Sequence, residues 1–222
     1  SQIAGTWCVV ALFAERNFAV GITFKKTEVI QTALFGLIIL GDKVSMTGWI
    51  SITIGLVGVL ILSDKPSGGG TFFNRFFNKA AGLGIISGAF FAISAVGYRG
   101  ATLEISSPDP LIRSSLTLAV VTLMQTIGMF VWLTQSEQGE IRRVIRAWRT
   151  AIWIGFAGMA GSLCWFTAFT LQSAAYVFAI GQIEVIFSLA ASFLIFKEKI
   201  TSREFSGIFF LSASILGLIL LS

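Results

Sequence analysis

The sequence lacks histidine altogether and has only two cysteines and three prolines among its 222 residues. Without histidine, the usual general base and the commonest metal ligand are both missing. No GxSxG, HExxH or Walker pattern occurs either. Cys8 and Cys164 both fall in apolar segments, where they are expected as small packing residues rather than as a disulfide or metal ligands. We therefore expect no enzyme activity, no metal and no cofactor.

Charge is also scarce, whereas apolar residues are abundant: 12% of the chain is charged and 55% is hydrophobic. With a mean hydropathy of +0.85, such a chain is expected to have lipid as its solvent. Apolar segments of about 20 residues, enough to cross a bilayer as helices, recur without the alternation of a membrane strand. We predict an all-α polytopic membrane protein with eight spans, at residues 1–14, 19–41, 47–63, 81–101, 111–134, 151–171, 174–196 and 205–222.

The basic excess, a net charge of +5, is attributed to loops that face phospholipid headgroups rather than to nucleic-acid binding. The run EIRRVIRAWR, from Glu140 to Arg149, is typical of a basic amphipathic helix on the membrane surface. Basic residues gather in the loops after the first, third, fifth and seventh spans, which the positive-inside rule places in the cytoplasm. The expected partners are the bilayer and a small-molecule substrate, and the oligomeric state is not indicated.

An internal repeat is visible when residues 4–44 are aligned with residues 160–200, at an offset of 156. After a three-residue insertion the match continues at an offset of 159. Shared polar and small positions at one offset are not expected from two unrelated apolar helices, so the pattern indicates a duplication. The paired positions include Gly5 and Gly161, Cys8 and Cys164, Glu28 and Glu184, Asp42 and Glu198, Gly48 and Gly207, and Gly58 and Gly217.

Five predicted spans separate equivalent positions of the two copies, and an odd number reverses the orientation of the second copy across the bilayer. The prediction is therefore an inverted-topology repeat, as found in many secondary carriers. We assign residues 1–63 to the last three helices of the first copy, 64–80 to an inter-repeat loop, and 81–222 to a second copy of five helices. By this count about two further helices would precede Ser1, giving ten in a complete protein.

The helices that end in LGDK and FKEK, and the closing helices with GLVGVLILS and ILGLILLS, carry a resemblance to a known group of proteins. The chain resembles the drug/metabolite transporter superfamily, specifically the EamA-type carriers with two five-helix halves. The resemblance covers essentially the whole chain and implies a secondary carrier with cytoplasmic termini. The distribution of basic loops instead places the C-terminus outside, so the orientation stays open.

Of the acidic residues, only Glu28 and Glu184 lie deep inside predicted spans, and they are equivalent positions of the two copies. Each is about 14 to 15 Å from the start of its span, close to the bilayer midplane. A charge at this depth costs about 2.5 to 3.5 kcal/mol, so it persists only where it faces protein or a water-filled cavity. Inverted-repeat carriers place their sites at this depth.

Helical periodicity places each glutamate on a small and polar face, and we predict that the two faces line a central cavity. Lys25 would hold a substrate carboxylate or phosphate, and the glutamates would bind an ammonium group or carry a coupling proton. The competing interpretation is a Lys25–Glu28 ion pair that only neutralises itself within the bundle. The predicted site residues are Lys25, Glu28, Thr32, Gly181, Glu184 and Ser188, and further candidates are Lys26, Gln182, Tyr98 and Arg99.

Two of these candidates also have simple structural explanations, since Tyr98 is expected as an interfacial aromatic and Arg99 as a snorkelling arginine. The stretch from Gly84 to Gly88 is expected to be a small-residue seam for close helix packing.

The functional hypothesis is a secondary transporter that moves small polar or amphipathic metabolites, such as amino-acid-like solutes or drugs, by alternating access. Its expected location is the plasma or inner membrane. The alternative is a membrane-embedded sensor or scaffold subunit that transports nothing. An intramembrane enzyme would need a nucleophile or metal constellation that the sequence does not contain.

Overall fold

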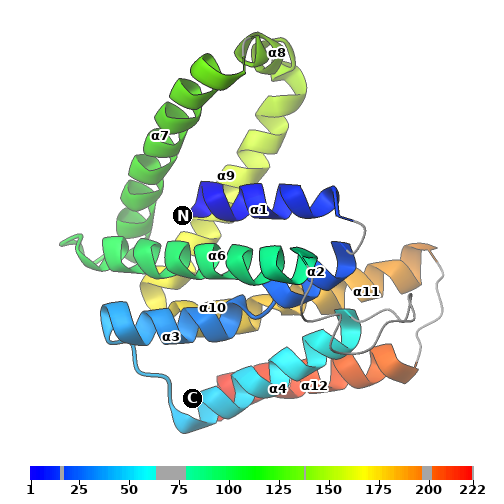
Figure 1. Cartoon of the computed structure of the whole chain (residues 1–222). Coiled ribbons are helices and arrows are strands. Elements are labelled where there is room, and N and C mark those ends of the chain that lie inside the picture. Colours follow the sequence, from blue (N-terminus) through cyan, green and yellow to red (C-terminus); the bar gives the residue numbers. More distant parts are fainter. Residues whose placement is uncertain (16–17, 64–78, 138, 197–201, 222) are drawn as a thin grey trace. The chain divides into compact units, whose positions relative to one another are not determined.

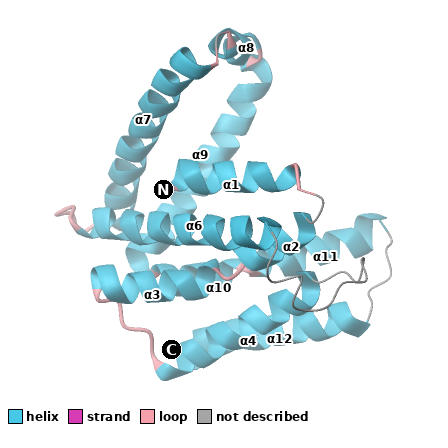
Figure 2. Ribbon diagram, viewed as in Figure 1, coloured by secondary structure: helices cyan, strands magenta, loops and turns pink. Residues whose placement is uncertain are grey.

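The computed structural model describes residues 1–15, 18–63, 79–137, 139–196 and 202–221. Within these ranges all regular structure is helical, which confirms the predicted all-α class (Figures 1 and 2). The helices are α1 (Gln2–Phe13), α2 (Phe18–Lys25), α3 (Glu28–Leu40), α4 (Met46–Ser63), α6 (Lys79–Leu103), α7 (Pro110–Ser136), α8 (Glu140–Arg146), α9 (Trp148–Leu171), α10 (Ala174–Gly181), α11 (Ile183–Phe196) and α12 (Ser202–Leu221).

Among the described residues, three helices are long and apolar enough to cross a membrane. These are α6, α7 and α9, with 25, 27 and 24 residues. The other apolar helical stretches among the described residues have 10 to 17 residues. The multi-pass character follows from the three long helices, whereas the number of eight spans stays a prediction.

Two spans that we predicted as continuous, 19–41 and 174–196, are each broken. α2 ends at Lys25 before α3 begins at Glu28, and α10 ends at Gly181 before α11 begins at Ile183. Neither break contains a proline.

Tight backbone hydrogen bonds replace the α-helical pattern at both breaks. The amide of Thr27 donates to the carbonyl of Phe24 at 3.1 Å, and the amide of Gln182 donates to the carbonyl of Ala179 at 3.3 Å. These bonds reach back three residues instead of four, as in a 3₁₀ turn. The Thr27 hydroxyl also donates to the carbonyl of Phe24, at 2.7 Å. Such local bonds leave the apolar pattern intact, so hydrophobic periodicity does not reveal the breaks.

The chain forms two compact units: residues 1–97 with 173–222, and residues 98–172. Their boundaries differ from those of the predicted repeats, because packing within this structure groups elements of both copies together. The repeat boundaries at 63 and 81 therefore stay a prediction, and most of the predicted inter-repeat loop, residues 64–78, lies outside the described residues.

The first unit is built on a close antiparallel contact between α4 and α12, which lie side by side in Figure 1. A Cβ on Gly58 would lie 2.9 Å from the carbonyl oxygen of Gly207, and a Cβ on Gly207 would lie 3.0 Å from that of Gly58. The hydroxyl of Ser214 donates to the carbonyl of Ser51 at 2.6 Å. Small residues thus allow the two backbones to approach closely, as in other membrane helix pairs.

α3 packs against α10 in the same unit, through a buried cluster that includes Val29, Ala33, Ala175 and Ala179. α6 covers the opposite side of the α2–α3 break with its glycines. A Cβ on Gly84 would lie 2.1 Å from the carbonyl oxygen of Gly21, and a Cβ on Gly88 would lie 3.0 Å from that of Lys25. This contact confirms the predicted packing role of the Gly84 to Gly88 seam.

The second unit is a hairpin of α7 and α9 connected by α8 (Figure 1). α7 begins at Pro110 behind an Asp109 cap, whose carboxylate accepts a hydrogen bond from the Leu111 amide at 2.8 Å. α8 occupies most of the predicted basic amphipathic segment, so the helix expected there is confirmed.

Candidate functional site

The first helix break holds a partly buried ion pair. Lys25 Nζ lies 2.8 Å from Glu28 Oε2, and Glu28 is only 6% exposed. The ammonium group also lies 4.7 Å from the centre of the Phe91 ring on α6, a cation–π contact. Buried Thr32 donates from its hydroxyl to the backbone carbonyl of Glu28 at 2.6 Å. The structure therefore brings together three of the predicted site residues, Lys25, Glu28 and Thr32. Lys25 and Glu28 form the ion pair that the competing interpretation predicts.

The second break is joined to the first by another ion pair. Lys26 Nζ lies 2.7 Å from Glu184 Oε1, and the two residues come from different predicted copies. The side chain of Glu184 is 64% exposed, whereas that of Lys26 is 13% exposed. Because the helix turns after Lys25, Lys26 reaches Glu184 on α11, a contact that a continuous helix would not predict.

Gln182, at the second break, carries a buried acceptor that has no partner among the described residues. The residue is 6% exposed, and its Oε1 makes no hydrogen bond, while its Nε2 donates to the Phe178 carbonyl at 3.3 Å. A buried acceptor without a partner carries a desolvation cost of about 1 to 3 kcal/mol. Gln182 and Lys26 line a cavity of only about 10 Å³, which is no larger than a single water needs.

Gln31, which is not among the predicted site residues, has a similar acceptor at the first break. Its Oε1 is buried without a hydrogen-bond partner in the described part of the chain, and its Nε2 donates to the Thr27 hydroxyl at 3.1 Å. In the sequence, the feature that could have indicated Gln31 is its amide, three residues after Glu28 inside an otherwise apolar run. Each break therefore has one carboxylate, one lysine contact and one amide acceptor.

The remaining candidates lie elsewhere or are not fully described. Gly181 is the last residue of α10, immediately before the second break, and Ser188 lies on α11 with a side chain outside the described part. Tyr98 belongs to the second unit, where its ring stacks on Phe166 at 4.4 Å. Arg99 Nη1 donates to the carbonyls of Phe169 and Gln172, at 2.8 and 2.7 Å. This arginine therefore caps the C-terminal end of α9.

The two breaks together bring two ammonium and two carboxylate groups into the first unit. Each carboxylate is paired with one ammonium, at 2.8 and 2.7 Å, so the four charges balance. Within the described residues no group of three or more histidine, cysteine, aspartate or glutamate side chains is placed to hold a metal ion. The arrangement can exchange an internal ion pair for a charged ligand, or take up a proton on a carboxylate.

Comparison with known proteins places the chain in a family. One solved crystal structure of a protein is similar with a TM-score of 0.67 at 13% sequence identity, covering 98% of this chain and 74% of the other. At this identity the likeness concerns the fold alone. No curated protein sequence matches. The model of the EamA-like transporter family matches residues 78–221, well over half of the sequence. The chain is therefore a multi-pass membrane protein of the EamA-like transporter family, within the drug/metabolite transporter superfamily.

Proposed function

We propose that this protein is a secondary carrier for small polar or amphipathic metabolites, with amino-acid-like solutes as the favoured class, and that it works by alternating access. The observation that carries the proposal is the pair of helix breaks, which fall at equivalent positions of the two predicted copies and each have ionisable side chains. Discontinuous helices of this kind form the substrate and ion sites of many inverted-repeat carriers.

The contact between α4 and α12 supports the inverted repeat that this mechanism needs. Gly58 packs against Phe210, and the residues equivalent to them in the other copy, Gly217 and Ser51, pack against each other. The two helices run antiparallel while exchanging equivalent contacts, as expected around a pseudo-two-fold axis in the membrane plane. Such an axis gives a carrier two related conformations.

The charge balance at the breaks favours a zwitterionic substrate. A carboxylate of the substrate would take the place of a glutamate at a lysine, and its ammonium group would take the place of a lysine at a glutamate. At one internal pair, such a zwitterion gives both the lysine and the glutamate a new partner while the other pair stays closed, so no charge is left unpaired, which would be unfavourable. A solute with one charge would leave one such group without a partner.

A sensor or scaffold function is the second candidate, and one observation favours it. Both carboxylates already have ammonium partners, so the site is neutral without any ligand. A purely structural role predicts that neutral residues replace Glu28 and Glu184 without loss of function.

A thermal-stability screen of the purified protein separates the two candidates. Amino acids, sugars, nucleotides, phosphorylated metabolites and cationic drugs are each added to the wild type and to Glu28→Gln and Glu184→Gln. A ligand present at 100 times its Kd adds about 2.7 kcal/mol to the stability of the folded state. We expect amino acids to shift the wild type and both substitutions to abolish the shift.

The matched control is Glu104→Gln, which removes an exposed carboxylate outside the site and should respond to amino acids as the wild type does. Stabilisation by another class alone would replace the amino-acid assignment. If no class stabilises the protein, or if the site variants respond like the control, the scaffold candidate takes precedence.

A further inference from the structure

We propose that the second unit, residues 98–172, binds one anionic phospholipid of the bilayer. The acyl chain lies in a groove between α7 and α8, and arginines of α8 hold the phosphate. This site is independent of the substrate site proposed above, since all its residues belong to the hairpin.

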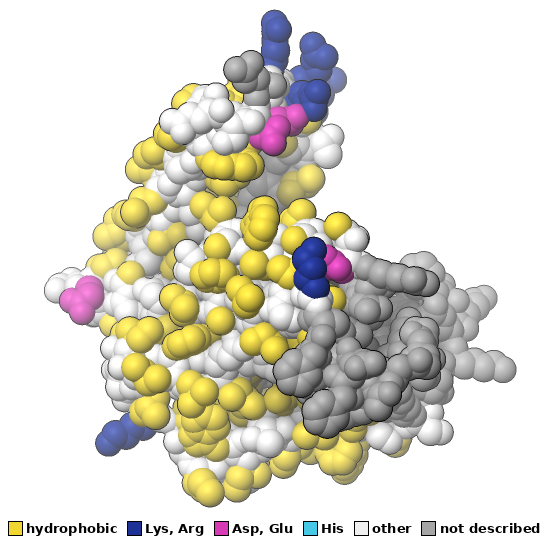
Figure 3. Space-filling view, in the orientation of Figure 1, with side chains coloured by type: hydrophobic (Ala, Val, Ile, Leu, Met, Phe, Trp, Pro, Cys, Tyr) yellow, Lys and Arg dark blue, Asp and Glu magenta, His cyan; other side chains and the backbone are white. Residues whose placement is uncertain are grey.

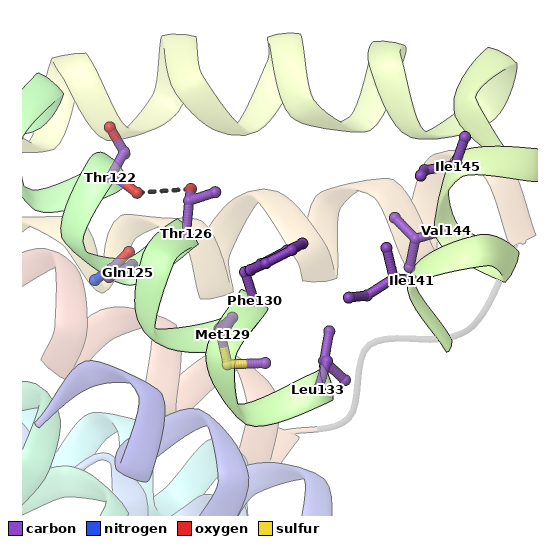
Figure 4. Close-up of a pocket in the computed structure, with 9 residues that line it drawn as sticks. All are labelled: Thr122, Gln125, Thr126, Met129, Phe130, Leu133, Ile141, Val144 and Ile145. Atoms are coloured by element: carbon purple, nitrogen blue, oxygen red, sulfur yellow. Dashed lines mark hydrogen bonds between the residues drawn. The ribbon is translucent and has the colours of Figure 1, made fainter. Parts of the chain in front are cut away.

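The groove has a volume of about 420 Å³, within the range of about 300 to 1,000 Å³ that ligand pockets occupy. Figure 4 shows Phe130 of α7 on one side and Ile141 and Ile145 of α8 on the other, directed toward the same space. The lining residues are Thr122, Gln125, Thr126, Met129, Phe130, Leu133, Ile141, Val144 and Ile145.

The polar groups of this lining are already engaged with protein atoms. The hydroxyls of Thr122 and Thr126 each donate to the backbone carbonyl four residues earlier, at 2.7 Å. Gln125 Nε2 donates to the hydroxyl of Tyr98 at 3.3 Å. The remaining lining is aliphatic and aromatic, and Phe130 and Val144 are 55% and 57% exposed. A surface with these properties suits a hydrocarbon chain better than a polar solute.

The same short helix that lines the groove carries the positive charge. Arg142, Arg143 and Arg146 are exposed on α8, and Arg149 follows at the start of α9. Figure 3 shows Lys and Arg side chains gathered at this end of the hairpin. Arg143 is paired with Glu140, whereas Arg142 and Arg146 form no ion pair with any residue that the structure describes.

Arg142 and Arg146 are separated by one helical turn, so their side chains start about 5 to 6 Å apart and reach one phosphate together. Arginine is well suited to this task, since its guanidinium matches the geometry of phosphate oxygens.

The position along the hairpin agrees with a lipid rather than a soluble anion. α7 and α9 are both long and apolar enough to cross the bilayer, and α8 connects them at one end. The groove runs along α7 from Leu133, close to α8, toward Thr122, so it extends from headgroup depth into the hydrocarbon. Clusters of basic residues beside a membrane helix attract anionic lipids.

Native mass spectrometry of the purified protein, titrated with dioleoyl phosphatidylglycerol or dioleoyl phosphatidylcholine, tests the proposal. We expect the wild type to bind the anionic lipid at least about tenfold more tightly, because the choline cation neutralises the phosphate of phosphatidylcholine whereas phosphatidylglycerol keeps its net negative charge for the arginines. Arg142→Gln combined with Arg146→Gln should remove that preference. Lys43→Gln with Lys79→Gln removes the same charge from the first unit and should preserve it.

A second pair of variants tests the groove. Thr126→Trp fills the space and should abolish the tightly bound lipid, whereas Ile127→Trp, on the neighbouring exposed position outside the groove, should retain it. Equal binding of the two lipids by the wild type overturns the proposal. So does a preference that survives the double arginine variant, or tight binding that survives Thr126→Trp.

Discussion

The two helix breaks occupy equivalent positions of the predicted copies, yet their glutamates have opposite environments. Glu28 is buried beside a lysine of its own segment, and the side chain of Glu184 is 64% exposed with a lysine from the other copy as its partner. The difference comes from the neighbours: α6 packs its glycines against the first break. Equivalent residues therefore acquire different properties through the packing around them.

Under the proposed mechanism this asymmetry belongs to one conformation of the carrier. An inverted repeat reaches the opposite conformation when the two copies exchange their arrangements. Glu184 would then take the buried environment and Glu28 the exposed one. Substitutions at either break should therefore affect the buried and the exposed glutamate differently.

The largest effect on folding stability is expected from a larger side chain in the glycine contact that buries the first break. In Gly84→Val, the new Cβ would lie 2.1 Å from the Gly21 carbonyl oxygen. The backbone at Gly21 cannot move aside without separating α6 from α2. We expect a loss of about 3 kcal/mol or more of folding stability, measured by thermal unfolding in detergent. Gly82→Val, on the same helix with nothing within 4 Å of its Cβ, is the control, and equal losses in both would contradict the packing argument.

A smaller effect is expected when the two glutamates are replaced, and the loss of folding stability should differ between them. Glu28→Gln leaves the ammonium of Lys25 without its charged partner in a partly buried setting, at a cost of about 2 kcal/mol. Glu184→Gln removes a largely exposed carboxylate and should cost less than about 1 kcal/mol. Denaturant or thermal unfolding of both variants in one detergent provides the comparison. A larger loss for Glu184→Gln would reverse the assignment of the buried and exposed sides.

The smallest effect is expected for the pair that joins the copies. In a double-mutant cycle of Lys26→Met and Glu184→Gln, the coupling energy for folding should stay below about 1 kcal/mol, because one partner is largely exposed. The same cycle, measured on ligand affinity, should give a larger coupling if the pair opens for substrate. A large coupling in folding with none in binding would assign the pair a structural role.

Much of the fold was predictable because lipid imposes strict rules on a sequence. The length of the apolar segments predicts the long helices α6, α7 and α9. The small residues from Gly84 to Gly88 predict a close contact with another helix. The helix breaks were not predictable in this way. Without a proline they depend on short backbone bonds, such as that from Thr27 to Phe24, which leave no mark on the hydrophobic pattern.

The site was predictable only in part for the same reason. Depth and repeat equivalence made Glu28 and Glu184 site candidates, which stays a prediction, and the ion pair of Lys25 and Glu28 is the one that the competing interpretation predicted from helical spacing. The contact between Lys26 and Glu184 depends on the turn after Lys25 and on the packing of two distant segments. The cap that Arg99 provides for α9 likewise needs residues 70 and 73 positions away. Neither long-range contact can be derived from local periodicity.

The glycine contact between α4 and α12 also has a consequence for biosynthesis. α12, the partner of α4, is synthesised only after the whole of α6 to α11. During that interval the small-residue face of α4 around Gly58 has lipid, or an insertion factor, in place of Gly207. The α4–α12 pair therefore forms only once α12 has been synthesised, and a ribosome that stalls before α12 leaves the small-residue face of α4 uncovered for quality control to recognise.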